Sequence, residues 1–384
     1  MTDRARAAQV ATRTGPVGAD IMANRAVRGA ADIARGAGPA RHYSWLMARD
    51  PLLSVTEKGI YCPEGDFFID PWAPVPRALI THGHADHARP GHAAYLATRA
   101  AAPVMRHRLG EIALDTVGYG EARTIGGVTV SFHPAGHVPG SAQIRVERGG
   151  EVWVVSGDYK TVPDGLSEPF EPVKCHAFVS ECTFGLPVFK WADQAEVMGE
   201  VNRWWAGNRA AGRFTLLGAY ALGKAQRLLS GLDPGIGPIL THGAVEATNA
   251  VMRAQGIALP ETVQVTPEID LKAHAGALVL APPSALAGPW ARRFRPASTG
   301  FASGWMALRG VRRRRAADRG FVLSDHADWA GLNAAIAATG AEKVLVTHGY
   351  TSVFRRWLES RGYDATIVET EFEGESLEAG EGAA

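Results

Sequence analysis

The sequence contains few cysteines, no long apolar run and almost no excess of charge. Its 384 residues include three cysteines, Cys62, Cys175 and Cys182, and no two of them form a Cys-x-x-Cys pair. This scarcity argues against a disulfide scaffold and a cysteine-rich zinc module, and it fits a reducing cytoplasm. No window approaches 18 uninterrupted apolar residues and the N-terminus lacks a secretory pattern. We therefore expect a cytoplasmic protein with no membrane partner.

The charges of the chain nearly cancel. Forty basic and 39 acidic residues give a net charge of +1. This balance excludes a uniformly basic coat for nucleic acid but leaves room for a local basic patch. The apolar fraction of 46% is ordinary for a globular protein. The length predicts two to three domains, or one large domain with an insertion.

Short apolar runs that end in a turn and a polar residue recur along the chain from about residue 51. We expect each run to form a buried strand, because each is short and bounded by turn residues. Polar groups just past the ends of such strands can be gathered by loops into one site. The runs cover residues 67–69, 78–80, 128–130, 152–155, 177–179, 321–323 and 344–346.

Helical patterns alternate with these strands. Asp193 and Glu196 have capping-box spacing before an apolar stretch that Gly212 closes. Asp328 and Thr351 are expected to cap two further helices. Strands mixed with helices predict a layered α/β protein.

The distribution of these patterns predicts a domain with an insertion. The first stretch is rich in Ala, Arg and Gly and the last is rich in Glu and Gly, and we expect both to be flexible. The predicted parts are a flexible extension (1–42), a first domain in two pieces (43–192 and 319–373), an inserted αβ domain (193–318) and a flexible tail (374–384).

The strongest signal for chemistry is the run His82-Gly83-His84-Ala85-Asp86-His87. It follows a predicted strand and offers four metal ligands within six residues. In a loop, His82 and His84 can face one ion while Asp86 and His87 face another. Imidazole and carboxylate groups suit zinc, and also manganese or iron.

So short a run cannot complete two metal sites, so further ligands must come from other strand ends. His137, Asp158 and His348 each follow the same pattern of a strand and a turn. Asp70 ends a strand shortly before the histidine run, and we expect it to orient a ligand imidazole.

These motifs resemble the metallo-β-lactamase superfamily and, within it, the β-CASP nucleases. The histidine run is similar to the signature of the superfamily, and two later segments match its other ligand motifs. Three more segments resemble the acidic, second and third motifs of the β-CASP branch. The resemblance covers roughly residues 51–373 and is closest to the bacterial DNA ligase-associated exonucleases. The later ligand motifs are residues 135–141 and 156–158, the β-CASP motifs are residues 181–185, 324–326 and 347–349, and the runs shared with the exonucleases include residues 59–63 and 69–72.

The resemblance implies a metallo-β-lactamase αββα sandwich with an inserted β-CASP-like domain, and a centre of two divalent ions. Zinc is the expected metal and manganese the alternative. Such a pair lowers the pKa of bound water and neutralises the oxygens of a phosphodiester. The implied ligands are His82, His84 and His137 for one ion, Asp86, His87 and His348 for the other, and Asp158 as the bridge.

The same resemblance implies a metal-dependent DNA exonuclease acting in repair with an ATP-dependent DNA ligase and a helicase. Asp86, Glu181 and His326 are the expected catalytic residues. His326 would donate a proton to the leaving oxygen, and Glu181 would fix its tautomer. Cys182 stands where Ser or Thr is usual. RNA-directed members of the branch keep the histidine at position 348, so an RNA-processing nuclease remains the alternative.

Clustered basic residues are the expected contacts with nucleic acid. The densest group is Arg312, Arg313, Arg314 and Arg315, which would bind phosphates. Lys160 and Lys224, the latter with Arg227, are further candidates. Trp72, Trp305 and Tyr220 could stack on bases, although core packing is the more common role of such aromatic residues.

Two other functions are compatible with the motifs. The fold alone would also suit a small-molecule hydrolase such as a lactamase or thioesterase. A non-catalytic binding subunit is the other possibility. The length of the insertion argues against the first, and the complete ligand set argues against the second.

Overall fold

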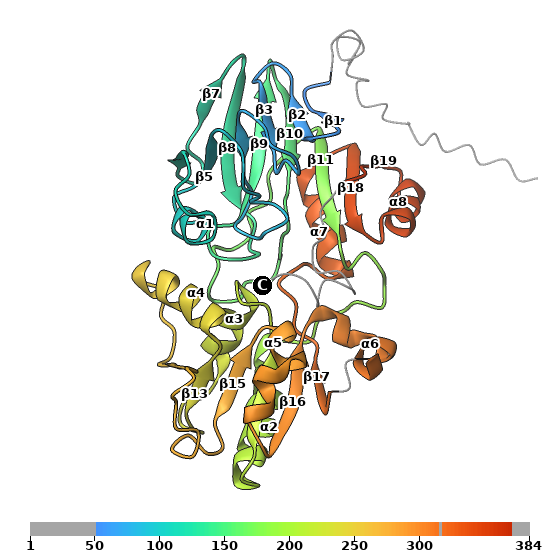
Figure 1. Cartoon of the computed structure of the whole chain (residues 1–384). Coiled ribbons are helices and arrows are strands. Elements are labelled where there is room, and N and C mark those ends of the chain that lie inside the picture. Colours follow the sequence, from blue (N-terminus) through green and yellow to red (C-terminus); the bar gives the residue numbers. More distant parts are fainter. Residues whose placement is uncertain (1–50, 315–316, 371–384) are drawn as a thin grey trace, which may run out of the picture. The chain divides into compact units, whose positions relative to one another are not determined.

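A computed structural model describes residues 51–314 and 317–370 of the chain, and Figure 1 labels most of their elements. Three sheets and eight α-helices among these residues confirm the predicted mixed α/β class. The predicted extension 1–42, the tail 374–384 and Arg315 lie outside the described residues. Within the described part, none of the helices combines the length and apolar character needed to span a lipid bilayer.

The first sheet has six strands in sequence order. Its first three strands pair antiparallel, and β3 to β6 run parallel. The strands are β1 (Ser54–Thr56), β2 (Gly59–Cys62), β3 (Phe67–Ile69), β4 (Ala78–Leu79), β5 (Tyr95–Thr98) and β6 (Leu114–Val117).

The second sheet has seven strands in the spatial order β19-β18-β11-β10-β9-β8-β7. Strands β10, β11, β18 and β19 run parallel, and β7 to β10 pair antiparallel. The strands are β7 (Arg123–Ile125), β8 (Val128–Pro134), β9 (Ala142–Arg148), β10 (Glu151–Val155), β11 (Ala177–Cys182), β18 (Lys343–Gly349) and β19 (Asp364–Ile367).

These two sheets pack face to face, with helices on their outer faces. Ile69 and Leu79 of the first sheet share one apolar cluster with Ile144 and Val155 of the second. Helix α1 (Ala102–Leu109) covers the other face of the first sheet through Met105. Helices α7 (Trp329–Thr339) and α8 (Thr351–Ser360) cover the other face of the second sheet. The central strands of both sheets are thus buried on both faces, which explains why their short runs are apolar throughout.

The third sheet contains six parallel strands in the order β14-β13-β15-β12-β16-β17. All its strands come from the chain between β11 and α7. They are β12 (Phe214–Gly218), β13 (Ile239–Thr241), β14 (Val263–Gln264), β15 (Leu278–Ala281), β16 (Ala297–Ala302) and β17 (Arg319–Phe321).

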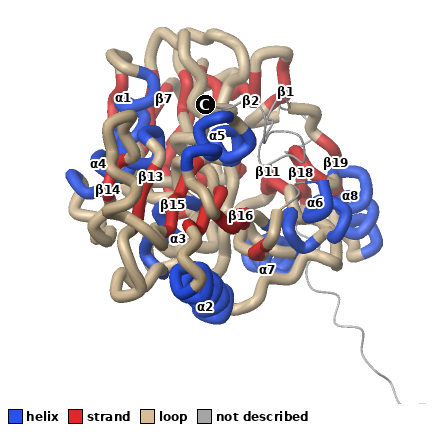
Figure 2. The backbone as a smooth tube through the Cα atoms, turned by 60° about the horizontal axis from the view of Figure 1, so that its bottom comes forward, coloured by secondary structure: helices blue, strands red, loops and turns tan. Residues whose placement is uncertain are grey.

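Helices cover both faces of the third sheet. One apolar cluster joins it to α2 (Gln194–Ala210), α3 (Lys224–Gly231) and α4 (Gly243–Ala254), and another joins it to α5 (Pro283–Ala287). Figure 2 shows α2 and α5 on opposite sides of strands β15 and β16. Two 3₁₀ turns, η2 (Pro289–Arg293) and η3 (Gly304–Ala307), and the short helix α6 (Arg309–Arg314) complete this part.

The third-sheet part contacts the first sheet's helix at one place that matters for the site. Helix α4 packs against α1, and Gln255 donates to the carbonyl of Ala100 at 2.8 Å. Val104 of α1, Leu222 and Met252 form a small apolar cluster there. The contact places Leu222, which immediately precedes α3, close to the histidine run that follows β4.

Two of the predicted helix caps are confirmed and one is wrong. Asp193 and Asp328 accept backbone hydrogen bonds at the starts of α2 and α7. Thr351 is the first residue of α8, and its capping position is held by Tyr350 without a side-chain bond. The strand predicted at 321–323 lies earlier, because β17 ends at Phe321.

Candidate metal centre

The candidate centre forms where strands from both packed sheets end. His82 follows β4, His137 follows β8 and Asp158 follows β10, while His348 lies at the end of β18. Strands β18, β11 and β10 are direct neighbours and parallel, so their carboxyl ends lie at one edge of the sheet. Residues far apart in the sequence therefore meet there.

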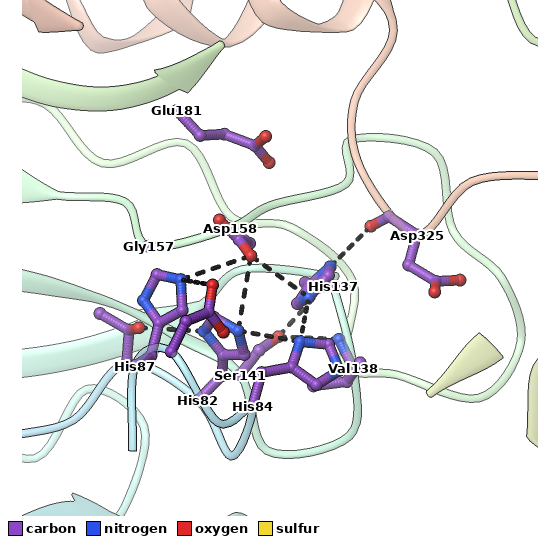
Figure 3. Close-up of polar contacts among 12 residues, drawn as sticks. His82, His84, His87, His137, Val138, Ser141, Gly157, Asp158, Glu181 and Asp325 are labelled. Carbon is purple, nitrogen blue, oxygen red and sulfur yellow. Dashed lines mark hydrogen bonds and ion pairs between the residues drawn. The ribbon is translucent and has the colours of Figure 1, made fainter. Parts of the chain in front are cut away.

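The first group of ligand atoms comes from three histidines and one aspartate. Ligand atoms of His82, His84, His137 and Asp158 all lie within 4.8 Å of one another. His84 Nδ1 lies 3.1 Å from His82 Nε2 and 3.0 Å from His137 Nε2. In Figure 3, dashed lines join the Asp158 carboxylate to His82 and His137, and join His84 to both of these rings. This buried His/Asp cluster can hold a metal ion.

The hydrogen bonds on the far sides of two rings support a cation between them. His137 Nδ1 lies 2.9 Å from the carbonyl of Asp325, and His84 Nε2 lies 3.3 Å from the carbonyl of Leu222. A carbonyl only accepts, so each of these nitrogens carries the hydrogen in a neutral ring. The facing atoms, His84 Nδ1 and His137 Nε2, then present lone pairs to each other. These two nitrogens would hold a metal ion, which would remove the repulsion between their lone pairs.

A chain of hydrogen bonds from Asp70 orients His82 in the same way. The Thr81 hydroxyl donates to the Asp70 carboxylate, so it accepts from His82 Nδ1 at 3.1 Å. His82 Nε2 is thereby left facing the cluster. Asp70 also accepts from His87 Nδ1 at 2.8 Å. One carboxylate thus fixes two imidazoles, and Asp70 does so from a left-handed backbone conformation with φ of 44°.

The three imidazoles of the first group stay neutral, as ligands must. Burial lowers the pKa of His137 to about 3, with a further contribution from the neighbouring His326 and His84. Burial also lowers the pKa of His82 and of His84. Protons therefore compete weakly with a metal ion at these nitrogens.

The second predicted group lies beside the first, with Asp158 between them. Asp158 Oδ1 lies 3.0 Å from His348 Nε2, and Oδ2 lies 3.5 Å from His87 Nε2. The same Oδ2 lies 3.5 Å from His82 Nε2 and 3.7 Å from His137 Nε2. Asp158 thus faces both groups, as a bridging ligand would.

Carboxylates make the second group strongly favourable for a positive charge. Asp86 Oδ2 lies 3.6 Å from His87 Nε2. Burial alone would lower the pKa of His87, but the carboxylates of Asp86 and Asp158 outweigh it and raise that pKa well above its ordinary value. In turn, although burial acts to raise the pKa of Asp158, His87 and His326 hold it well below its usual range. The local field suits a cation.

Glu181 and His326 form a pair next to Asp158. His326 Nδ1 lies 2.9 Å from both carboxylate oxygens of Glu181. Glu181 Oε1 also accepts from the Tyr159 backbone at 2.8 Å, and the indole of Trp191 donates to the His326 carbonyl at 2.9 Å. Ligand atoms of Asp158, Glu181 and His326 lie within 4.8 Å of one another. This places an imidazole held by a carboxylate at the edge of the candidate centre.

The cations predicted to contact nucleic acid fall into two kinds. Lys160 and Lys224 are only 3% and 1% exposed. Lys160 donates to the Val162 carbonyl, and burial lowers its pKa to about 8. Lys224 pairs with Asp325 at 3.6 Å and lies over the Tyr220 ring. Their burial argues against a direct contact with a polymer.

Arg312, Arg313 and Arg314 are exposed on helix α6. The predicted aromatic contacts are less accessible: Trp72 and Trp305 are buried and Tyr220 is half-buried. Among the predicted contacts that the structure describes, only Arg312, Arg313 and Arg314 are exposed, as a contact with nucleic acid requires.

Sequence reasoning did not single out Thr81, Asp325 or the carbonyl of Leu222 as parts of this centre. Thr81 and Asp325 each adjoin a predicted histidine, His82 and His326, which was an available signal. A backbone carbonyl leaves no mark in a sequence, so the contact of Leu222 with His84 could not be anticipated.

Comparison with known proteins gives relatives by sequence and by structure. No family model matches the chain. A protein named "Probable DNA ligase" from Opitutus terrae is 30% identical over 313 residues, which are 81% of this chain and 30% of that protein. Proteins named endoribonuclease ysh-1 of Neurospora crassa and YSH1 of Candida albicans are 29% and 30% identical over 129 and 122 residues. Those matches take in 31% of this chain and 14% of each relative.

The chain therefore spans less than a third of the length of these curated relatives. Among solved structures, a protein of unknown function from Enterococcus faecalis V583 aligns with a TM-score of 0.53 at 11% identity. The alignment covers 77% of this chain and 80% of that one, so the two share a fold.

Proposed function

We propose that this protein is a metal-dependent nuclease that hydrolyses phosphodiester bonds of DNA ends or single strands. The observation that carries the proposal is the convergence of His82, His84 and His137 on Asp158, with the Glu181–His326 pair beside it. Neutral nitrogen ligands, a bridging carboxylate and an adjacent acid or base are the parts that such hydrolysis needs.

The proposal includes the fold: residues 43–192 and 319–373 would form a metallo-β-lactamase αββα sandwich. Residues 193–318 form the inserted β-CASP-like domain. Two packed sheets with helices on their outer faces, and a third sheet built from one continuous stretch, support two domains. Strand β17 (Arg319–Phe321) pairs with β16 in the third sheet, so the second boundary of the insertion falls after Phe321, not after residue 318. The described residues cover all of the two domains except 43–50, 315–316 and 371–373.

Two divalent ions, zinc by preference or manganese, supply positive charge and lower the pKa of water when bound. His82, His84 and His137 would hold one ion, and Asp86, His87 and His348 the other, with Asp158 between them. Asp70 keeps the ring orientation of His82 and His87 through the contacts described above. Asp86 is the most exposed of the three residues proposed for the second ion.

Proton transfer to the leaving oxygen is assigned to His326. Glu181 accepts the Nδ1 hydrogen, so Nε2 is the atom that exchanges a proton with substrate. The carboxylate also stabilises the imidazolium that forms when Nε2 takes up its proton. The buried Tyr159 N–H and the Trp191 indole hold Glu181 and the His326 backbone in place.

DNA is the substrate class of this proposal, on the strength of the relative that matches the largest share of this chain. The similarity to a protein named as a probable DNA ligase extends over 81% of this chain. An exonuclease acting in DNA repair beside an ATP-dependent ligase and a helicase accounts for it. The exposed arginines of α6 would bind the phosphates of the strand, because each such contact releases counterions.

An RNA-processing nuclease is the second candidate. The similarity to proteins named as endoribonucleases supports it, as does His348, whose Nε2 lies 3.0 Å from Asp158. The supporting match is confined to 31% of this chain, so the DNA assignment is preferred.

One experiment tests the function and separates the two substrates. DNA and RNA strands of one sequence, labelled at either end and given single- or double-stranded, are incubated with protein loaded with Zn²⁺ or Mn²⁺. We expect stepwise shortening of DNA, with Asp86→Ala inactive. Preferred internal cleavage of RNA would instead select the second candidate. If wild-type protein and Asp86→Ala degrade neither polymer, the proposal is wrong.

A further inference from the structure

Two of the proposed ligand histidines, His84 and His137, contact backbone carbonyls through the ring nitrogen that faces away from the centre. Neither carbonyl belongs to the two packed sheets whose strands lead to these histidines. The Leu222 carbonyl contacts His84 Nε2, and the Asp325 carbonyl contacts His137 Nδ1. Leu222 belongs to the third-sheet part, just before α3, and Asp325 lies between β17 and α7. The tautomers of His84 and His137 therefore depend on the positions of the backbone at Leu222 and at Asp325.

The Asp325 segment is seated by two buried cations. The Asp325 carboxylate lies 3.6 Å from Lys224 Nζ and 3.2 Å from Arg227 Nη1. Arg227 also donates to the Ser324 carbonyl, and its Nε donates to Gln194 Oε1 at 2.6 Å. Three of these groups are nine-tenths buried or more, with Lys224, Arg227 and Asp325 only 1%, 4% and 4% exposed. Buried charges so paired fix the backbone around them, since losing a partner leaves a desolvated charge.

The start of α3 also packs directly on both histidine loops. We call residues 222–227 the α3 start segment. A Cβ on Gly83 would lie 3.7 Å from the Leu222 side chain and one on Gly223 would lie 2.4 Å from Val138. Gly223 has φ of +84°, so a larger residue is excluded there by both conformation and space. The segment is thus wedged against the residues next to His82, His84 and His137.

We propose that Lys224 and Arg227 are positioning residues for the metal ion held by His82, His84 and His137. By holding Asp325 and the α3 start segment against the histidine loops, they fix the ring tautomers and so set the affinity for that ion. The inference rests on the proposed metal centre. It gives Lys224 a role different from the nucleic-acid contact that its charge alone predicts.

The test measures metal affinity in the full chain. Wild type, Lys224→Met, Lys224→Arg and Arg227→Met are titrated with Zn²⁺ against a competing chelator, and bound metal is counted by mass spectrometry. Lys58→Met is the matched control, because it removes the same charge from an exposed side chain in the turn between β1 and β2. Binding of labelled DNA is measured in parallel at saturating metal, and Co²⁺-loaded samples give an absorption spectrum of the ligand field.

We expect Lys224→Met and Arg227→Met to bind one of two ions about 10- to 100-fold more weakly, the range for loss of a group that orients a ligand. The second ion, DNA affinity at saturating metal and the Lys58→Met control stay as in wild type. Lys224→Arg restores most of the affinity, and the Co²⁺ spectrum changes only in the two methionine variants.

Four results would overturn the inference. Unchanged metal affinity with weaker DNA binding would make Lys224 a nucleic-acid contact. Equal weakening of both ions, together with a lower melting temperature of metal-free protein, would reveal general destabilisation. If wild type binds metal and both methionine variants bind it with the same affinity, this inference alone is overturned. If wild type binds no metal, the proposed function is overturned as well.

Discussion

The buried cations around Asp325 and the exposed cations of α6 look alike in the sequence but differ in what surrounds them. Lys224 and Arg227 are almost wholly buried and are paired with one carboxylate. Arg312, Arg313 and Arg314 lie exposed on a short helix. The first group is committed to the protein, while the second can exchange its counterions for a polyanion. A basic residue in a sequence therefore says little about its partner until its burial is known.

Burial changes the chemistry of a cation as well as its partners. Removing an ammonium group from water disfavours its charged form, which is why the pKa of Lys160 falls to about 8. Lys224 avoids isolation through Asp325, whose carboxylate balances its charge. The arginines of α6 keep their hydration, so their contribution to binding should depend on salt.

The largest effect is expected from a change in the candidate metal centre, which should alter catalysis without altering the exposed arginines of α6. Asp158→Ala deletes the carboxylate that faces both sets of ligands. We expect loss of bound metal and a fall in the rate of hydrolysis of at least about 1000-fold, since charge stabilisation in the transition state is lost. DNA affinity should stay near that of wild type, because the α6 arginines are untouched. A variant that keeps its metal and its activity would contradict the bridging role of Asp158.

The next effect concerns stability and has a defined pH dependence. Although burial acts to raise it, Lys224 and Arg227 lower the pKa of Asp325 from 3.8 to about 2. At 1.36 kcal/mol per pKa unit, this contributes about 2 kcal/mol to the stability of the folded state. Because the folded-state pKa is depressed, the contribution is complete above pH 4 and is lost as the pH falls toward 2.

Urea unfolding of metal-free protein checks this expectation. Asp325→Asn should be less stable than wild type by about 2 kcal/mol at pH 7, and the difference should shrink below pH 4. If wild type and Asp325→Asn differ in unfolding free energy by the same amount at pH 7 and at pH 3, the charge of the Asp325 carboxylate does not contribute to stability through Lys224 and Arg227.

A smaller effect is expected from the exposed group. Replacing Arg312, Arg313 and Arg314 together by Gln should reduce the dependence of log K on log salt by about 2 to 3 for duplex DNA. Affinity at low salt should fall with it, while the metal content stays at the wild-type value. Fluorescence anisotropy over a range of NaCl concentrations measures both quantities. A salt dependence equal to that of wild type would place the binding strip elsewhere.

The smallest effect should come from an exposed cation that is already paired and lies away from α6. Arg99 is 62% exposed and pairs with Glu121. Arg99→Gln should cost less than about 1 kcal/mol of stability and leave DNA affinity unchanged. It removes one positive charge, whereas the α6 variant removes three, so the change in DNA affinity per charge removed separates the effect of position from that of net charge. Weaker DNA binding by Arg99→Gln would show that net charge, and not the position of the α6 arginines, sets the affinity for DNA.

The sequence predicts the α/β class and most strand ends well, because each depends on local patterns. The runs before His82, Asp158 and His348 are all strands in the structure. The histidine run after β4 could be recognised by its spacing alone. The meeting of His137 and Asp158 with that run depends on sheet order, which the sequence shows only through resemblance.

What the sequence could not show are contacts made through backbone and burial. Val322 and Leu323 look like strand residues, yet β17 ends before them and the chain turns toward His326. Lysine is almost always exposed, so the burial of Lys224 runs against its usual behaviour. Thr351 has the side chain of a helix cap, but the chain enters α8 through Tyr350.

The order of strands in the second sheet sets the spacing of the functional residues at its edge. Glu181 lies in β11 and His348 in β18, and Asp158 follows the end of β10; these three strands are hydrogen-bonded neighbours. Adjacent strands lie about 4.8 Å apart whatever their side chains. The distance between these functional groups is therefore a property of the backbone, and exchanging one side chain for another would retune the reactivity of this edge without moving its attachment points.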